Sequence, residues 1–327
     1  MNPVTRGPGW RCANSFPAVK IRRMLGSFLK NLWTARPPGV PASSEQSPPG
    51  DQRSRIYEAA LADARMGRIP EAIAGCEAAL AIDPDYQAAH FLRAAIDLPG
   101  ESYFTVLERF HAHLRPRTYV EIGVATGDSI RSVDPQTRAL GVDPAPEIAF
   151  ELPSNVKIFA QKSDDFFAQN DVLAELGGLP IELAFIDGMH HFEFALRDFM
   201  NIEPLCAPDS TILIHDVYPL DERTAARERE TTFWSGDIWR LVLLLRKHRP
   251  DLIVHTIAAQ PTGLAIVRNL DPQSRYIRDH LDQLIEEYLA VDFGVLDGCK
   301  AERLALFPND WMRISALLEA PAAGARR

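Results

Sequence analysis

The stretch that decides the fold runs from residue 119 to residue 129 and reads Tyr119-Val120-Glu121-Ile122-Gly123-Val124-Ala125-Thr126-Gly127-Asp128-Ser129. Its first half is apolar around one acid, and its second half is small residues ending in an Asp-Ser pair that favours a helix start. This pattern predicts a buried strand, a glycine-lined turn and a helix. Because glycine lets the backbone approach a ligand closely, we expect a nucleotide-like ligand at the turn.

Composition limits the possible classes of protein. The chain has 327 residues, of which 46% are hydrophobic, enough for a large α/β domain with an appendage. The net charge of −9 is unevenly spread, because residues 1–50 carry seven basic residues and one acid, which is +6 and leaves −15 for the rest. A body this acidic is unsuited to phosphate contacts, so we expect no nucleic-acid partner.

The first predicted segment, residues 1–52, is a basic, proline-rich tail with the composition of a disordered chain. Within it, residues 19–33 have the pattern of a short basic amphipathic helix. A contact with a membrane surface is one interpretation, and a solvated tail is the favoured one, since short isolated helices are marginal. No apolar run approaches the ~20 residues of a membrane span. The N-terminus also lacks a signal-like apolar stretch, so we expect a cytoplasmic protein.

The second predicted segment, residues 53–98, is alanine-rich with helical periodicity. It resembles one tetratricopeptide repeat, with Gly67, Ala72, Ala79 and Pro84 at the small-residue and proline positions. Such repeats need about three copies for independent stability. We therefore expect this segment to pack on the next domain or on a sister subunit, which would make a homo-oligomer. A peptide-binding groove is the less favoured alternative.

The third segment, residues 101–270, alternates helical and apolar strand patterns, which predicts a parallel sheet. A helical extension over residues 271–327 follows. The pattern predicts a helix at 237–248 and seven strands, at 119–122, 139–142, 156–160, 182–186, 211–214, 252–256 and 263–267. The last two strands are close in sequence and are expected to pair antiparallel. The expected fold is α/β, a Rossmann-like, seven-stranded, mostly parallel sheet after a small helical segment.

The acid and glycines of the opening stretch, Glu121-x-Gly123-x-x-x-Gly127, differ in spacing from the dinucleotide fingerprint G-x-G-x-x-G. They resemble motif one of class I S-adenosylmethionine-dependent methyltransferases. The resemblance implies S-adenosylmethionine as the cofactor, with Gly123, Ala125 and Gly127 forming the turn against its methionine part. It also implies that Glu121 accepts a hydrogen bond from the cofactor's ammonium group, directly or through water.

Two further elements follow in the order that this resemblance requires. Asp143 ends the second predicted strand, where an acid can accept both ribose hydroxyls. Ser163 and Asp164 follow the third strand, in the loop that meets the adenine in that family. Capping of the next helix is the alternative role for these two residues.

Acids and histidines follow the next two predicted strands. The stretch Ile186-Asp187-Gly188-Met189-His190 ends one strand, and Ile214-His215-Asp216 ends the other. Because open α/β sheets bind ligands at the carboxyl ends of their strands, Asp187, His190 and Asp216 are expected to converge if the two strands are neighbours.

These two stretches resemble a subgroup of small-molecule and sugar O-methyltransferases related to the macrolide and catechol enzymes. The resemblance implies a divalent metal held by Asp187 and Asp216, with His190 or His215 open as the third ligand. Two carboxylates favour Mg²⁺, whereas a histidine ligand suits Mn²⁺ or Zn²⁺ better. The alternative is that both acids only hold the cofactor and the loop backbone.

The chemistry that this resemblance implies is an in-line displacement on a sulfonium, in which orientation supplies much of the acceleration. A hydroxyl acceptor must also lose its proton, and His190 beside Asp187 is the candidate general base. The predicted activity is O-methylation of a small hydroxylated acceptor, such as a sugar, a polyol or a phenol. The loop over residues 218–236 is either a lid over the acceptor or a solvated connection.

Two other functions stay open. A nicotinamide-dependent oxidoreductase is disfavoured by the glycine spacing and by the absence of a Tyr-x-x-x-Lys sequence. A non-catalytic adaptor that binds a partner through the helical repeat is disfavoured because Glu121, Gly123, Asp143, Asp187 and Asp216 are all intact.

Overall fold

The computed structural model describes residues 51–319. The predicted helix over residues 19–33 and nearly all of the predicted basic tail lie outside the described residues. Within residues 51–319, none of the helices combines the length and the apolar character that a bilayer span requires.

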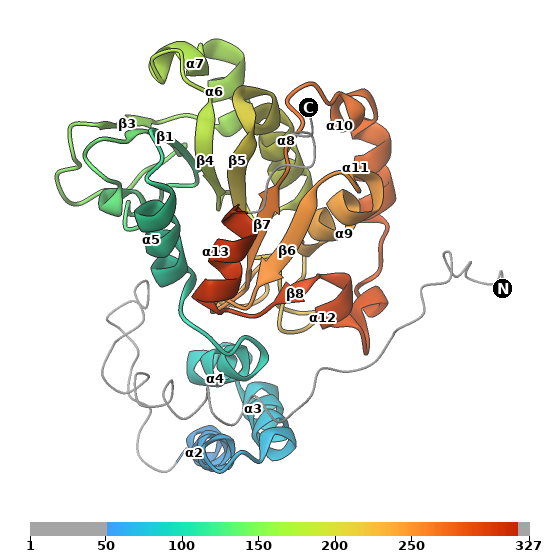
Figure 1. Ribbon diagram of the computed structural model, residues 1–327. Coiled ribbons are helices and arrows are strands. Elements are labelled where there is room, and N and C mark those ends of the chain that lie inside the picture. Colours follow the sequence, from blue (N-terminus) through green and yellow to red (C-terminus); the bar gives the residue numbers. More distant parts are fainter. Residues whose placement is uncertain (1–50, 320–327) are drawn as a thin grey trace.

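The centre of the molecule is one eight-stranded sheet with the strand order β3-β2-β1-β4-β5-β7-β6-β8 (Figure 1). Strands β1 to β5 are parallel to one another, and β7 runs antiparallel to both β5 and β6. The predicted Rossmann-like fold and the antiparallel pair are therefore confirmed. The strands are β1 Thr118–Ile122, β2 Arg138–Val142, β3 Val156–Phe159, β4 Ile181–Ile186, β5 Cys206–His215, β6 Ile253–Ile257, β7 Leu264–Arg268 and β8 Leu306–Phe307.

The eighth strand corrects the prediction of seven strands and of a wholly helical segment after residue 270. Strand β8 has only two residues and pairs in parallel with β6, Thr256 opposite Leu306 and Ile257 opposite Phe307. Two residues are too few to display the alternating pattern by which a strand is recognised in a sequence.

Helices cover both faces of the sheet (Figure 1). On one face, Phe166, Leu196, Leu241 and Leu284 join the larger apolar core. They come from α6 Ser163–Gln169, α8 Phe192–Ile202, α9 Trp239–His248 and α11 Leu281–Leu289. The other face is covered by α5 Tyr103–Leu114 and α13 Trp311–Glu319. The short helices α7 Val172–Glu175, α10 Tyr276–Asp279 and α12 Lys300–Arg303 complete the domain.

The helix predicted after the glycine turn is absent. Residues 123–137 contain only a 3₁₀ turn, Ile130–Ser132. Pro135 disfavours helical backbone at Asp134, so a helix cannot continue past Val133. The connection over residues 143–155 also contains no helix. Helices α5 and α13, which flank the sheet in sequence, cover the face that these two connections leave open.

The segment before the sheet domain contains α2 Gln52–Arg65, α3 Ile69–Ile82 and α4 Gln87–Asp97. Small residues let α2 and α3 approach closely, since a Cβ at Gly75 would lie 2.6 Å from the Cβ of Ala60. These helices bury an apolar cluster of their own that includes Cys76 and Leu92. The likeness to a tetratricopeptide repeat and the boundaries at 98, 101 and 270 stay predictions.

A buried ion pair joins the segment after α8 to the end of α9. Arg249 donates to both carboxylate oxygens of Glu203, each at 2.8 Å, and both side chains are almost fully buried. Arg249→Met leaves the carboxylate without its cation. We expect this variant to lose about 3–5 kcal/mol of unfolding free energy in urea titrations.

Lys247→Met is the matched control, because its partner Glu287 and Lys247 are both exposed. Exposed pairs contribute about 0–1 kcal/mol, so this variant is expected to unfold close to the wild type. Equal losses in the two variants would contradict the role assigned to the buried pair.

Candidate functional site

A cavity of about 610 Å³ opens at the carboxyl ends of β1, β2 and β4. The structure brings seven of the predicted site residues into its wall: Gly123, Ala125, Asp143, Ser163, Asp164, Asp187 and His190. A larger cavity of about 860 Å³ lies between α3, the 218–236 loop and residues 289–293, and it contains none of the predicted site residues. The smaller cavity is therefore the candidate site.

The glycine turn is shaped by a close approach of two backbone segments. Gly123 has a φ of +89°, and a Cβ there would lie 2.0 Å from the backbone oxygen of Asp187. Its amide donates to Val142 O at 2.8 Å, which ties β1 to β2. Only glycine tolerates both the positive φ and the close approach of the Asp187 backbone oxygen. The turn after β1 and the turn after β4 are thus locked against each other.

Asp143 supports the same turn from the end of β2. Its Oδ2 accepts from the amide of Ala125 at 2.9 Å, and its Oδ1 accepts from the amide of Ala145 at 2.8 Å. A carboxylate has about four acceptor positions, so Asp143 keeps capacity for further donors from the cavity.

Glu121 and Gly127 do not line the cavity. The Glu121 carboxyl is fully buried behind the turn, where it accepts from Tyr119 Oη at 2.6 Å and from Ser129 Oγ. Ser129 is the residue that reaches the cavity wall. Burial raises the pKa of Glu121 to about 8, and its two hydroxyl donors offset only part of that shift. Glu121 therefore orients Ser129, and a direct contact with a ligand is not available to it in this arrangement.

The residues after β3 form the far end of the cavity. Helix α6 begins at Ser163, Lys162 is its N-cap residue, and no side chain caps this helix end. The capping role considered for Ser163 and Asp164 is therefore not seen. Asp164 is exposed at the rim, whereas Ser163 is half-buried beside Asp198 of α8.

At the opposite end, two aspartates and two histidines converge from the ends of β4 and β5. His190 Nε2 lies 3.0 Å from Asp216 Oδ2 and 3.8 Å from Asp187 Oδ1. His215 Nδ1 lies 3.1 Å from Asp187 Oδ1 and 3.3 Å from Asp216 Oδ2. Since β4 and β5 are hydrogen-bonded neighbours, the predicted convergence is confirmed.

Three of these side chains have the spacing of a metal site. One ligand atom each from Asp187, His190 and Asp216 lies within 4.8 Å of the others. Asp216 Oδ2 is buried and lacks a hydrogen-bond partner among residues 51–319, although His190 lies close to it. An unsatisfied carboxylate oxygen beside an imidazole nitrogen fits a shared cation.

His215 is the other residue considered as the third metal ligand. Its Nδ1 contacts Asp187, and its Nε2 lies 3.2 Å from Thr262 Oγ1. Both ring nitrogens are thus engaged with protein groups, and the ring is nearly fully buried. In this arrangement His215 orients the carboxylates, and His190 is the better placed third ligand.

The backbone at this cluster is strained. His190 has a φ of +55° and Asp216 a φ of +60°, in the left-handed region that residues with a Cβ seldom adopt. Each such residue costs of order 1–3 kcal/mol and persists only where the surroundings hold it. The two strained residues are also the two partners of the contact between His190 Nε2 and Asp216 Oδ2. This coincidence indicates that the position of the two side chains has a function.

Electrostatics keep the cluster charged. Burial lowers the pKa of His190 and His215, but the nearby carboxylates outweigh it, so the pKa of His190 is raised and that of His215 reaches about 10. Burial raises the pKa of Asp216, yet His190 and His215 hold it well below its usual range. The histidines and Asp216 thus stabilise one another's charged forms, and a bound cation would compete with protons for the same groups.

Two further residues complete this end of the site. Thr262 Oγ1 donates to Asp216 Oδ1 at 2.6 Å. The Tyr103 ring lies on the ring of His215 with centroids 3.8 Å apart, and Tyr103 also lines the cavity. Sequence reasoning missed both, because Tyr103 reads as a helix residue and Thr262 as part of a hairpin connection.

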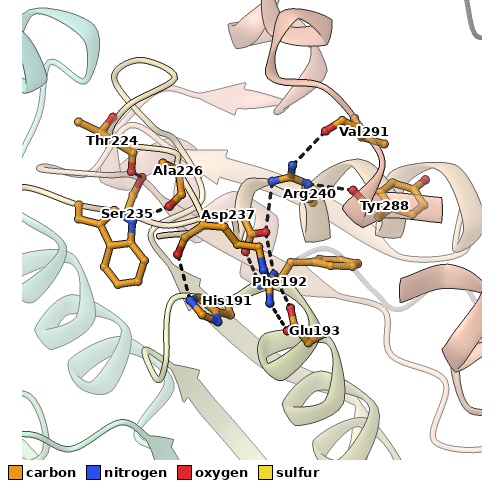
Figure 2. A network of polar contacts seen from close by, with 12 residues as sticks. His191, Phe192, Glu193, Thr224, Ala226, Ser235, Asp237, Arg240, Tyr288 and Val291 are labelled. Atoms are coloured by element: carbon orange, nitrogen blue, oxygen red, sulfur yellow. Dashed lines mark hydrogen bonds and ion pairs between the residues drawn. The ribbon is translucent and has the colours of Figure 1, made fainter. Parts of the chain in front are cut away.

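A polar network holds the turn that carries His190 (Figure 2). Asp237 is fully buried and its Oδ1 accepts from the amide of Phe192, the first residue of α8, at 2.7 Å. Its own amide donates to His190 O at 3.2 Å. Arg227 and Arg240 both lie beside its Oδ2, at 3.1 and 3.3 Å. Asp237 thus caps α8 from a distant segment and fixes the backbone of His190.

The loop over residues 218–236 is held between the helical segment and the site. Phe233 stacks on His90 of α4 with centroids 4.9 Å apart, and the amide of Thr232 donates to Asp85 at 2.6 Å. The next residue, Trp234, stacks on His190 with centroids 5.2 Å apart. The loop therefore packs on the candidate histidine through Trp234, whereas residues 221–223 and 228–230 are exposed.

Comparison with known proteins agrees with this geometry. Residues 120–217 match the family model described as a methyltransferase domain, in agreement with the resemblance to methyltransferases over that range. The match contains the glycine turn, Asp143, and the strand ends with Asp187 and Asp216. A search of curated proteins found no match.

The solved structures that this chain resembles are distant. The O-methyltransferase TomG from Streptomyces achromogenes, in complex with S-adenosylmethionine, is 15% identical, with a TM-score of 0.39 over 52% of this chain and 80% of that one. An O-methyltransferase from Bacillus cereus, in complex with S-adenosylhomocysteine, is 17% identical, with a TM-score of 0.39 over 54% and 86%. MycE, in complex with Mg, S-adenosylhomocysteine and mycinamycin VI, is 14% identical, with a TM-score of 0.36 over 53% and 49%.

Because Glu121 is buried and its pKa is raised, we expect the stability of the folded protein to depend on pH. Its pKa of about 8 lies above the ordinary value of 4.5, so the folded state keeps a proton that the unfolded chain loses. Stability therefore falls as the pH rises from about 5 to 8.5. Glu121→Gln keeps the shape without the charge, and we expect its melting temperature to exceed that of the wild type at pH 8.5 and to equal it at pH 5. Parallel melting curves at both pH values would contradict this assignment.

Because Phe233 packs on the helical segment, we expect this contact to limit the opening of the loop over residues 218–236. Phe233→Ala removes two aromatic contacts, with His90 and Phe91. Since each pair contributes about 0.5–1.5 kcal/mol, amide exchange over residues 218–236 should accelerate about fivefold or more, with β1 to β5 unchanged. Met66→Ala, at an exposed position of the same segment, is the control. Unaltered exchange in the loop would show that another contact holds it.

Proposed function

We propose that the protein is an S-adenosylmethionine-dependent O-methyltransferase for a small hydroxylated acceptor and that a divalent cation assists it. The main support for this proposal is that one cavity, of about 610 Å³, contains both groups of residues. Asp143 and the glycine turn lie at one end of it, and Asp187 and His190 lie at the other. The family match supports the methyltransferase class. Sugars, polyols and phenols remain the acceptor classes of this proposal.

The residues around the glycine turn would bind the methyl donor. Gly123 and Ala125 present backbone to its methionine part, and Ser129, oriented by Glu121, lines the same wall. Asp143 would accept from the ribose hydroxyls with the acceptor capacity that its two amide contacts leave free. Ser163 and Asp164 would lie at the adenine.

The residues at the ends of β4 and β5 would act on the acceptor hydroxyl. Methyl transfer needs the attacking oxygen, the methyl carbon and the sulfur in line, so positioning provides much of the rate. Tyr103, Phe104 and Met189 line the cavity beside Asp187 and supply apolar surface for the acceptor's carbon skeleton. The strained backbone at His190 and Asp216 would fix the positions of these two groups near the acceptor.

Asp187, His190 and Asp216 would hold the cation, and the mixed nitrogen and oxygen set suits Mn²⁺ or Zn²⁺ better than Mg²⁺. A cation at these groups supplies a lower pKa for a bound hydroxyl. In a cation-free enzyme, the neutral form of His190 would instead accept the hydroxyl proton, as predicted from the sequence. The two roles of His190 exclude each other in one step, and Mn²⁺ titration of His190→Gln separates them. If the variant loses Mn²⁺ affinity, His190 is a ligand of the cation. If it keeps Mn²⁺ affinity but loses turnover, His190 is the general base.

Asp216→Asn tests the proposal directly. The variant keeps the shape of the side chain and removes its charge, so we expect turnover with a labelled methyl donor to fall by about 10–100-fold or more. Calorimetry should show Mn²⁺ binding lost and affinity for S-adenosylhomocysteine within about threefold of the wild type, because Asp216 does not line the cofactor cavity.

Asp209→Asn, at an exposed position of the same strand, is the matched control and should retain turnover. Unchanged turnover in Asp216→Asn would remove the role proposed for the strand ends. Wild-type binding of NAD in place of S-adenosylhomocysteine would instead favour the oxidoreductase.

A further inference from the structure

Asp198 is a buried acid in the wall of the cofactor cavity that sequence reasoning did not identify. It lies in α8, with only 3% of its surface exposed, and contributes to the cavity wall. Its Oδ1 is buried and has no hydrogen-bond partner among residues 51–319. A buried carboxyl oxygen without a partner costs free energy, so a ligand group that donates a hydrogen bond there would recover it.

The surroundings of Asp198 contain little positive charge. Burial raises its pKa to about 7, the Ser163 hydroxyl opposes that shift, the Asp164 carboxylate adds to it, and Arg197 contributes only a small lowering. No lysine or arginine side chain among residues 51–319 therefore forms an ion pair with this carboxyl. A neutral donor such as an amino group suits the position better than a second charge, because it satisfies the oxygen without bringing a further ion into the interior.

The neighbouring wall has the character of a site for a flat heterocycle. Phe194 lies one helical turn before Asp198 on the same face of α8, and both line the cavity together with Pro144 and Ser163. Pro144 directly follows Asp143, the residue proposed for the ribose. The base attached to that ribose would therefore meet apolar surface from Phe194 and Pro144, with polar groups only at its edge.

We propose that Asp198 accepts a hydrogen bond from the exocyclic amino group of the cofactor's adenine and thereby selects adenine over hypoxanthine. The inference rests on the proposed function. Hypoxanthine carries a carbonyl oxygen in place of that amino group, so its oxygen would face the oxygen of Asp198. A site built to accept from an amino group rejects an analogue that lacks the donor, because the buried acceptor then stays unpaired.

Calorimetry with two ligands that differ at this one position tests the proposal. S-Adenosylhomocysteine and S-inosylhomocysteine are titrated into the wild type at pH 8.5, where Asp198 is ionised. We expect the adenine compound to bind at least about tenfold more tightly. In Asp198→Asn the amide offers a donor to the hypoxanthine carbonyl, so the ratio of the two affinities should fall to within about threefold or reverse. The ratio within one variant is insensitive to a loss of folded protein, which lowers both signals equally.

Two variants at the start of α6 separate Asp198 from the other acids nearby. Asp165→Asn is exposed and outside the cavity wall, and should keep the wild-type ratio. A changed ratio in Asp164→Asn, with an unchanged ratio in Asp198→Asn, would overturn the assignment in favour of Asp164. Wild-type protein that binds neither compound would refute the proposed function itself, whereas tight binding of both with equal affinity would refute only the role of Asp198.

Discussion

The constraint on which the rest of the site depends is the placement of two carboxylates at the ends of adjacent parallel strands. Asp187 and Asp216 follow β4 and β5, and their repulsion is balanced by His190 and His215 at 3.0 to 3.3 Å. Both His190 and Asp216 hold left-handed backbone to achieve this. A cluster with an unsatisfied buried oxygen and strained backbone is costly for stability alone, which is why it points to a chemical role.

The supports of this cluster come from segments far apart in the sequence. Asp237 caps the helix that follows His190 (Figure 2). The loop before Asp237 is held by Asp85 and His90 of the helical segment. The helical segment therefore supports the loop whose Trp234 stacks on His190. This arrangement gives the three helices of the segment a structural role beside the site.

The sequence predicted what local pattern determines. Apolar runs ending in acids identified the strand ends, so the convergence of Asp187, His190 and Asp216 followed from the fold class alone. The sequence-based prediction failed where the role of a side chain depends on which tertiary contacts it makes. The direction of the Glu121 side chain depends on Tyr119 and Ser129, the engagement of His215 depends on a residue 47 positions away, and Asp198 reads as an ordinary surface acid of a helix. The two-residue strand β8 had no pattern to recognise.

The central claim is that the glycine turn and Asp143 bind S-adenosylmethionine rather than a dinucleotide. Parallel calorimetric titrations of the wild type with S-adenosylhomocysteine and with NAD test it most directly. The account predicts saturable binding of S-adenosylhomocysteine at one site per chain and no binding of NAD. Binding of NAD without binding of S-adenosylhomocysteine would contradict it.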